Sequence, residues 1–472
     1  MIAVASTTVD LARAQFATTS IYHFLFVPLT LGLAPLVAIM QTIWHRKHDD
    51  AWLRLTRFFG TLLLINFAIG VATGLVQEFQ FGMSWSVYSN FVGGVFGAPL
   101  AIESLAAFML EATFLGLWIF GWGVLSPRIH LATIWIAAAG TWLSAYLILV
   151  ANSWMQHPVG YKIVDGKAQL TSVGALLSNE FALIAYLHTI LAGLIFGSIV
   201  MLGICCWHLL RGRNVELFRR AAKLALIVAV PVTLLQLSIG NRFGEAVTSQ
   251  QSMKIAASEA QWNTCQPCGF SVFQIGGFSA QNPNPSFSIV IPRLLSWMGT
   301  GSFDGKIQGL NQLQAQEQQQ YGPGNYMPRI ELMYWSMRIM AMLGVFMFLV
   351  AAVGAWLYRR RKLEKTRWFL WTAIVTIAAP YLAATFGWIL TEMGRQPWIV
   401  QGLLKTSQAV SPNLTTATIA ASLTVFVLLY ITLGVVDFVL MRRYARVDPP
   451  PADTGAPTGA EAAAALSYGA AT

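Results

Sequence analysis

Long apolar segments alternate with polar connections along the chain. A helix that crosses the hydrocarbon core of a membrane needs about 20 mostly apolar residues. The segments that meet this requirement are 17–43, 58–78, 95–123, 131–152, 180–208, 219–241, 329–357, 367–390 and 416–441. We therefore predict an all-α integral membrane protein with about nine transmembrane helices.

The composition agrees with this prediction. Of the 472 residues, 56% are hydrophobic and 11% are charged, whereas a soluble domain carries about 25% charged residues. The net charge of +10 does not indicate a nucleic-acid partner, because the basic residues are concentrated in alternate connections between the apolar segments. These connections are 46–57, 128, 211–223, 359–367 and 442–446.

The distribution of Lys and Arg also predicts the orientation of the chain. Connections rich in these residues remain in the cytoplasm. This places the N-terminus outside and the C-terminus inside, as nine spans require. We expect a single membrane domain over residues 1–446 and a disordered tail over 447–472, which begins with a run of prolines. One long external loop, 242–328, is rich in Gln, Asn, Gly and Pro; a loop of this length is usually functional or disordered.

The external loop contains a C-x-x-C motif, Cys265 and Cys268. Outside the cytoplasm a disulfide can persist, so we favour a disulfide that clamps the loop over a thiol redox switch. A single C-x-x-C pair is weak evidence for zinc. Cys205 and Cys206, in the fifth apolar segment, are expected to be inert packing residues.

Several polar side chains lie inside the predicted spans or at their ends, where an ionisable group is costly and is a candidate for function. Taken singly, a histidine or methionine there usually belongs to the core, and an acid with a nearby arginine can be a structural ion pair. Together, however, imidazole, thioether and carboxylate groups are the ligands of iron porphyrins, and a His/Met pair suits a low-spin haem. The candidates are His23, Glu103, Glu111, His188, Arg338, Met340, Glu392 and Arg395.

Short motifs follow one another in a characteristic order. They include HFLFVPLT at 23–30, FGAPL at 96–100, ANSWMQHPVG at 151–160 and GRQPW at 394–398. With these motifs the chain resembles subunit I of the cytochrome bd family of bacterial quinol oxidases, in the form with a short external loop. The resemblance extends from residue 13 to about residue 441.

The resemblance implies three haems, b558, b595 and d. His188 and Met340 would be the axial ligands of haem b558. His23 and Glu392 would ligate the two high-spin haems, and which haem takes which ligand stays open. Glu103 would be a distal or second ligand. The resemblance assigns the haem propionates to two arginines, Arg338 and Arg395.

The same resemblance implies a quinol site and a proton path. Lys254 and Glu259 of the external loop would bind quinol. Protons would reach the oxygen site from the cytoplasm along Glu111, His130 and Ser144. The expected activity is that of a terminal oxidase in the bacterial cytoplasmic membrane. By this resemblance, quinol would be oxidised at the outer face and O2 would be reduced to water, which would generate proton motive force without a pump.

The implied partners are a second large membrane subunit, membrane quinol and O2, and small single-span subunits are compatible with the resemblance. One alternative is a quinol oxidase of the same family that contains only b-type haem. A different class, the secondary transporters, places charged groups at the midplane between inverted repeats. No repeat is evident here, and the polar residues lie towards one side of the membrane.

Overall fold

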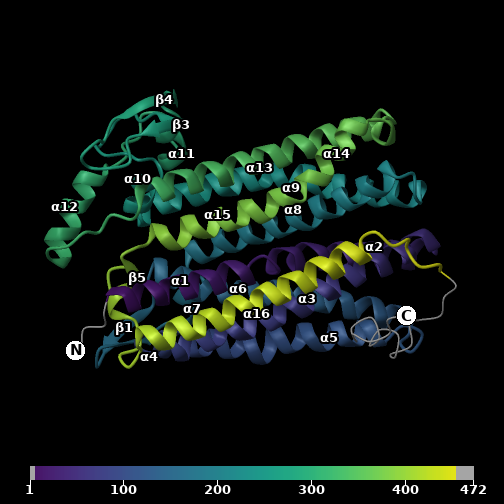
Figure 1. The fold of residues 1–472 in the computed structure, drawn as a ribbon, viewed down its shortest axis with the longest axis horizontal. Helices are drawn as coiled ribbons and strands as arrows, with labels where there is room; N and C mark the ends of the chain where they lie inside the picture. Colours follow the sequence, from purple (N-terminus) through teal and green to yellow (C-terminus); the bar gives the residue numbers. More distant parts are fainter. Residues whose placement is uncertain (1–5, 453–472) are drawn as a thin grey trace.

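The computed structural model describes residues 6–452, and its long helices run side by side along the longest axis of the molecule (Figure 1). Within the described residues, nine helical segments are long and apolar enough to cross a membrane. This confirms the predicted fold class. The spans are Thr7–Lys47, Asp50–Met83, Ser86–Phe120, Pro127–Gln156, Val173–Leu210, Val215–Gln250, Ile330–Arg359, Arg367–Gly394 and Thr416–Tyr444.

Some spans are single helices and others are interrupted. The uninterrupted helices are α3 (Asp50–Met83), α6 (Pro127–Gln156), α9 (Val215–Gln250), α13 (Ile330–Arg359) and α16 (Thr416–Tyr444). The interrupted spans consist of α1 (Ser6–His23) with α2 (Val27–Lys47), α4 (Ser86–Ile102) with α5 (Met109–Phe120), α7 (Val173–Leu177) with α8 (Glu180–Leu210), and α14 (Arg367–Thr376) with α15 (Ala378–Gly394).

Two interruptions coincide with candidate ligands. α1 ends at His23, and α2 begins just before Pro28, whose ring nitrogen has no hydrogen to donate and which therefore suits the first turn of a helix. Between α4 and α5 the chain forms a π-helical segment, Glu103–Phe108. Segments of this kind occur frequently at functional sites.

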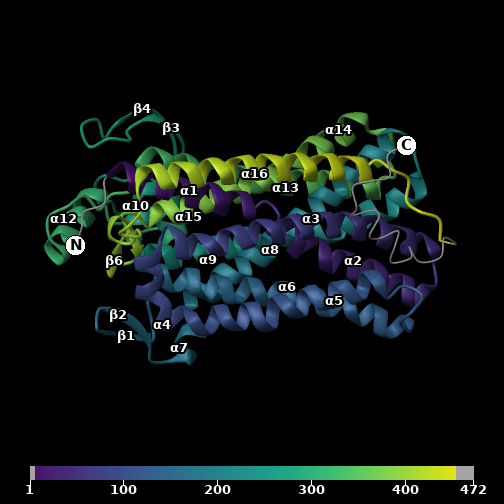
Figure 2. The same ribbon diagram turned by 60° about the horizontal axis from the view of Figure 1, so that its bottom comes forward.

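The centre of the bundle is the crossing of α2 and α8, the most deeply buried spans of the described chain. Glycines allow the two backbones to approach closely, as small residues commonly do between membrane helices. A Cβ atom on Gly32 would lie 1.9 Å from the carbonyl oxygen of Gly193, so no larger residue fits at this crossing. Figure 2 shows α4, α5 and α6 along one edge of the bundle and α16 along the opposite edge.

The loop between α9 and α13 is folded and not disordered. It begins later than predicted, because α9 continues to Gln250 instead of ending near residue 241. It contains α10 (Ser252–Ser258), the antiparallel hairpin of β3 (Phe270–Gly276) and β4 (Pro285–Ile291), α11 (Leu294–Thr300) and α12 (Leu310–Tyr321). At the same end of the bundle lie the short hairpins β1 (Tyr161–Val164) with β2 (Lys167–Leu170) and β5 (Trp398–Val400) with β6 (Leu404–Lys405).

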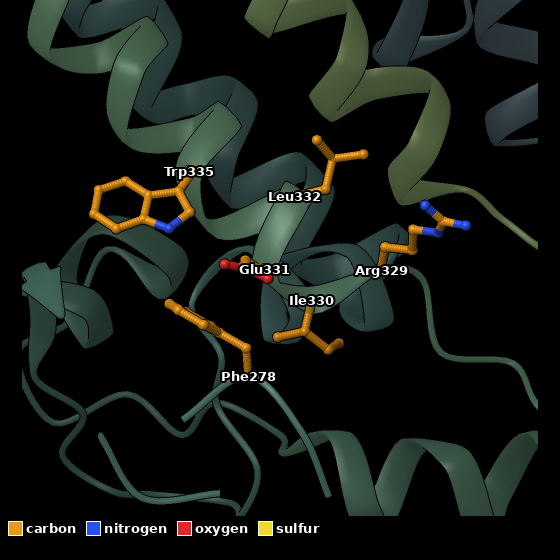
Figure 3. Close-up of a pocket in the computed structure, with 6 residues that line it drawn as sticks. All are labelled: Phe278, Arg329, Ile330, Glu331, Leu332 and Trp335. Carbon is orange, nitrogen blue, oxygen red and sulfur yellow. The ribbon is translucent and has the colours of Figure 1, made fainter. Parts of the chain in front are cut away.

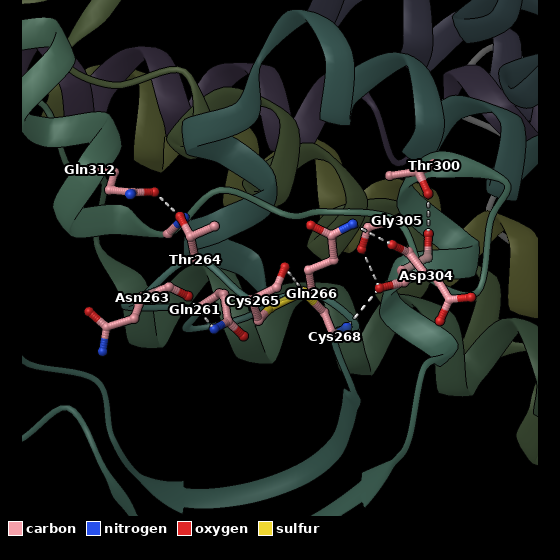
Figure 4. The surroundings of a disulfide bond; sticks show 12 residues. Gln261, Asn263, Thr264, Cys265, Gln266, Cys268, Thr300, Asp304, Gly305 and Gln312 are labelled. Carbon is pink, nitrogen blue, oxygen red and sulfur yellow. Dashed lines mark hydrogen bonds between the residues drawn. A yellow bond between two sulfur atoms is a disulfide. The ribbon is translucent and has the colours of Figure 1, made fainter.

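The structure joins Cys265 and Cys268 in a disulfide, as predicted (Figure 4). The surrounding hydrogen bonds tie this segment to the rest of the loop. The amide of Cys268 donates to the hydroxyl of Ser296 at 2.7 Å, and the side-chain amide of Gln266 donates to the carbonyl of Asp304 at 3.0 Å. The disulfide therefore belongs to the framework of the loop.

The first residues of the predicted tail, up to residue 452, are among the described residues and contact the bundle. At the end of the bundle opposite the loop, Asn214 donates to the Asp448 carboxylate at 2.8 Å. The guanidinium of Arg54 donates to the carbonyls of Pro449 and Pro450, each at 3.1 Å. The remainder of the predicted tail, 453–472, lies outside the described residues.

Candidate functional site

His188 and Met340 lie at opposite corners of a ring of four helices. α8, which carries His188, packs against α9 and α15, and α13, which carries Met340, packs against the same two helices. The amide nitrogen of Gln236, on α9, lies 3.1 Å from Nε2 of His188. An imidazole and a thioether therefore approach the interior of one four-helix unit from opposite corners.

Glycines stand beside both donor groups. A Cβ atom on Gly240 of α9 would lie 3.6 Å from Cε1 of His188, and one on Gly387 of α15 would lie 3.1 Å from Sδ of Met340. α9 thus lacks a side chain where it faces the imidazole of His188, and α15 lacks one where it faces the thioether of Met340. The donor set and this cradle fit a haem with His188 and Met340 as its two axial ligands.

His23 is held in a form suited to a metal ligand. The hydroxyl of Thr73 donates to the carbonyl of Gly70 at 2.9 Å, so its oxygen is free to accept the hydrogen of His23 Nδ1 at 3.0 Å. The proton is then on Nδ1, and Nε2 keeps its lone pair; a metal-binding histidine is usually oriented in this way. A Cβ atom on the adjacent Gly74 would lie 3.0 Å from Cε1 of the ring.

Both oxygens of Glu392 have partners. Asn152 of α6 donates to Oε1 at 3.0 Å, and Nε of Arg395 donates to Oε2 at 2.9 Å. One turn before Glu392, Trp388 packs edge to face on Phe24 at 4.8 Å between ring centroids. Phe24 follows His23, so the structure brings α15 alongside the His23 region.

Glu103 and Glu111 both face α6. Ser144 donates to Glu103 at 2.7 Å, and Thr141 donates to Glu111 at 2.8 Å. The acids are eight residues apart in sequence, but their partners on α6 are only three residues apart. The side chains therefore lean towards one another, across the wide turn of the π-helical segment.

His130 is separate from these carboxylates. It lies in the first turn of α6, where its Nε2–H donates to the carbonyl of Trp118 at 2.8 Å. Its Nδ1 then accepts from the side-chain amide of Gln41, also at 2.8 Å, and the Gln41 oxygen accepts from the Trp118 indole. This closed set of bonds matches a neutral imidazole. The structure thus groups Ser144 with Glu103 and leaves His130 apart from both acids.

The two loop residues that were expected to bind quinol have different partners. Glu259 forms a buried, two-pronged ion pair with Arg338 of α13, at 2.6 and 3.0 Å. The remaining N–H groups of Arg338 donate to the carbonyls of Ser258 and Ser271, so all five have partners within the chain. Burial raises the pKa of Glu259, and the guanidinium of Arg338 opposes that shift.

Lys254 is buried on the other side of α10. Its Nζ donates to Oε1 of Gln156 at 2.6 Å, and Nε2 of Gln156 donates to Asn152 at 2.8 Å. Because Asn152 also holds Glu392, a continuous chain of hydrogen bonds joins Lys254 to Glu392. Burial lowers the pKa of Lys254 to about 7, with the nearby Glu392 raising it and Arg395 lowering it.

A cavity of about 500 Å³ lies between the loop and the first turns of α13 (Figure 3). Its walls are the side chains of Phe278, Arg329, Ile330, Glu331, Leu332 and Trp335. Phe278 packs on Tyr334 at 5.3 Å, and the Tyr334 ring lies under the guanidinium of Arg338 at 3.9 Å. One aromatic layer thus separates this cavity from the Glu259–Arg338 pair. Its volume is typical of small-molecule sites.

Sequence reasoning missed the residues that hold the candidates in place. They are hydroxyl and amide side chains in helix interiors and glycines on neighbouring helices. The polar residues of α6 recur at 141, 144, 152 and 156, which is roughly helical spacing and was available as a signal. The glycines gave no such signal in the sequence, because their role depends on which helices pack together. Asn152 and Gln156 lie in the motif at 151–160, but no role was predicted for them from the sequence. The other missed residues are Thr73, Gly74, Thr141, Gly240 and Gly387.

The fold and the donor set define a class, the membrane-integral proteins that carry haem within a helical bundle. The particular family follows from comparison with known proteins. The family model for cytochrome bd terminal oxidase subunit I matches residues 11–449. The chain belongs to this family and is a subunit of a terminal respiratory oxidase, whose family implies haem cofactors and a partner subunit.

Individual relatives agree with this assignment. The chain is 44% identical to cytochrome bd ubiquinol oxidase subunit 1 of Bacillus subtilis (strain 168), over 90% of each chain. It is 36% identical to cytochrome bd-II ubiquinol oxidase subunit 1 of Escherichia coli (strain K12), over 95% of this chain and 98% of that one. The bd oxidase from Geobacillus thermodenitrificans superposes with a TM-score of 0.85, at 26% identity over 94% of this chain and 99% of that chain.

Proposed function

We propose that this chain oxidises quinol at the outer membrane face and passes the electrons to a buried site where O2 is reduced to water. The observation that carries the proposal is the position of two donor groups beside α15. Met340 contacts Gly387, and Phe24, next to His23, contacts Trp388 on the neighbouring face of the helix. Bound haem supplies the electron transfer and the iron that binds O2.

In this proposal His188 and Met340 would hold haem b558, and His23 and Glu392 would hold haems b595 and d. Glu103 would be a distal or second ligand of a high-spin haem, and Arg395 would neutralise a propionate. For Arg338 we propose a role other than the propionate contact expected from sequence: it orients Glu259, because all its N–H groups already have protein partners.

Quinol gives up two electrons and two protons when it is oxidised, so its site needs bases. We assign these to Lys254 and Glu259, which lie on different sides of α10 and at its end. The cavity beside Phe278 and Trp335 would admit the ring first, and the quinol would then have to pass the Tyr334 ring, which covers the Arg338 guanidinium, to reach Glu259. The two protons would leave on the outer side.

Lys254 gives this site a dependence on pH. With a pKa of about 7, its amine is mostly protonated at pH 6 and mostly neutral at pH 8. We expect kcat/KM for quinol to rise through this range, since only the neutral amine accepts a proton, and to lose that rise in Lys254→Gln. The matched control is Lys306→Gln, at an exposed position of the same loop. An unchanged pH profile in Lys254→Gln would exclude this role.

The lowered pKa of Lys254 also makes the stability of the folded chain depend on pH. Lys254 has a lower pKa in the folded chain than in the unfolded chain, where it is 10.5. The unfolded chain therefore binds more protons between about pH 7 and 10.5, and stability rises with pH over that window. Lys254→Gln should remove this contribution.

The protons for water would come from the cytoplasm along α6. Glu111, held by Thr141, would pass them to Glu103, held by Ser144. His130 lies at the far end of α6 with both ring nitrogens engaged, so we place it at the entrance as a structural residue. Release outside and uptake inside would build proton motive force without a pump.

Glu111→Gln tests this path. The amide keeps the shape of the carboxyl group and a hydrogen-bonding oxygen for Thr141, but it cannot carry a proton. We expect reoxidation of the reduced enzyme by O2 to slow by about 10²-fold, the size of a typical proton-transfer contribution. Stopped-flow absorbance measures this rate, with Glu216→Gln, exposed at the start of α9, as the control. Wild-type reoxidation would remove Glu111 from the path.

We place the protein in the bacterial cytoplasmic membrane, with its loop outside. Its expected partners are a second large membrane subunit and, in addition, small single-span subunits.

The decisive experiment is a dithionite-reduced minus air-oxidised spectrum of the purified complex, combined with pyridine haemochrome extraction. Bands of both b and d type would support the three-haem proposal. Only b-type bands would favour the b-haem-only oxidase, and absence of haem would overturn the ligand assignments.

A further inference from the structure

The β3–β4 hairpin of the outer loop has one apolar face that is exposed. Phe273 pairs with Ile289 and Ile275 pairs with Phe287, and cross-strand partners project to the same side of a sheet. These residues and Ile291, which we call the hairpin face, have exposures of 36% to 54%. The opposite side carries mainly polar residues, for example the Gln274–Ser288 pair, with Val290 as an exposed apolar exception. The hairpin is therefore amphipathic, with its apolar side uncovered.

The hairpin lies at the flank of the bundle, beside the outer end of α13, and does not cover the end of the helices (Figures 1 and 2). Phe273 packs edge to face on Trp335 of α13, at 5.4 Å between ring centroids. Further along α13, Met342, Phe346 and Leu349 are exposed, at the spacing of one helix face with Trp335. The hairpin face thus continues the lipid-facing side of a membrane-spanning helix.

The absence of charged residues indicates that the hairpin face contacts lipid and not water. No acidic or basic residue occurs between 270 and 291, although proteins usually protect exposed strands with charges. A tryptophan at the junction is typical of the level of the lipid headgroups. Large apolar side chains, no charge and a tryptophan at the junction are together the chemistry of the membrane interface.

We propose that the hairpin face lies in the outer leaflet of the bilayer and anchors the loop to the membrane. The cavity between Phe278 and Trp335 is then at the level of the leaflet. If the proposed function holds, a quinol with an apolar tail would reach this cavity from the membrane and not from water. The hairpin would form one wall of that entrance.

Neighbouring residues of β4 provide a matched test. Ile289→Cys places a thiol on the hairpin face, and Ser288→Cys places one on the opposite side. The native thiols of this chain do not compete, since Cys265 and Cys268 are bonded to each other and Cys205 and Cys206 are fully buried; labelling of the unsubstituted oxidase gives the background from the partner subunit. Each variant of the intact oxidase is labelled with an environment-sensitive fluorophore in phosphatidylcholine nanodiscs. A wild-type haem spectrum verifies that the labelled protein is folded.

We expect lipids with a nitroxide near the headgroup to quench the label at 289 several-fold more than the label at 288. Aqueous iodide should show the reverse order. Equal quenching of both labels by iodide would overturn the proposal, because the face would then lie in water. Protection of the 289 label from both quenchers would also overturn it and would indicate a protein partner. Neither readout requires quinol oxidation, so the result is independent of the proposed function.

Discussion

Replacing Met340 with leucine is expected to abolish the low-spin b-type spectrum while the protein remains folded. Leucine and methionine have similar volumes, and such exchanges in a packed interior usually cost less than about 1.5 kcal/mol. Only the thioether, which approaches the interior of the ring of helices beside Gly387, is lost. The remaining imidazole of His188 would leave a haem there high-spin or unbound. Absorbance and low-temperature EPR spectra of the purified variant measure this.

The matched control is Met342→Leu, which makes the same exchange two residues along α13. Met342 is 58% exposed on the lipid-facing side, so its variant should keep the wild-type spectrum. A normal low-spin spectrum in Met340→Leu would refute the assignment of this residue as a ligand. Loss of the low-spin spectrum in both variants would show instead that α13 tolerates no exchange of methionine for leucine.

The second large effect is expected at the Glu259–Arg338 pair. Glu259→Gln keeps the size of the side chain but removes the base proposed to take a proton from quinol. We expect kcat/KM for quinol to fall by about 10²-fold or more. The haem spectrum and the reoxidation of chemically reduced enzyme by O2 should be unchanged. Asp304→Asn, in an exposed ion pair with Arg293 of the same loop, is the control. Full activity with normal quinol saturation in Glu259→Gln would exclude the site.

Arg338→Met has a different expected result, because it leaves a buried carboxylate without its partner. Removal of one member of a buried ion pair typically costs about 3–5 kcal/mol. Arg338 also donates to two carbonyls of the loop, so the cost should fall on the attachment of the loop to α13. Hydrogen exchange of the backbone near Ser258 and Ser271 measures this local opening. Arg293→Met, at a surface pair, should change little.

The double variant Arg338→Met with Glu259→Gln separates the two roles. It removes the unpaired charge, so much of the lost protection should return. Quinol oxidation should remain low, because the base is still absent. Recovery of activity in the double variant would mean that Glu259 is structural and takes no proton.

The spans were predictable because length and apolarity alone determine which segments can cross a membrane, and the structure confirms the nine predicted segments within its described residues. The residues at which the helices end were less predictable. α9 continues beyond residue 241 because its last turns pack beneath the folded loop between α9 and α13, and sequence hydropathy carries no information on such contacts. The ordered stretch around Asp448 was missed for the same reason, since Asn214 and Arg54 are distant in sequence.

The candidate ligands could be proposed from their chemistry, but their partners could not. The pairing of Glu259 with Arg338 joins residues 79 positions apart, and no local pattern predicts it. Lys254 and Glu259 suggested one joint pocket, whereas the structure directs Lys254 to Gln156 and Glu259 to Arg338. Such contacts depend on which helices are neighbours, a property of the whole fold.

The position of α15 has a consequence for the speed of electron transfer. Adjacent residues of this helix, Gly387 and Trp388, touch the Met340 side chain and the ring next to His23. Successive residues are about 100° apart around a helix, and a helix with its side chains is about 10–12 Å across, so groups bound beside these two residues would lie on neighbouring faces of α15. Because Gly387 has no side chain, the group beside Met340 would lie close to the backbone of α15. α15 would then be the part of the protein that separates the two groups, and Gly387→Leu would place a side chain against Sδ of Met340 and disturb that residue.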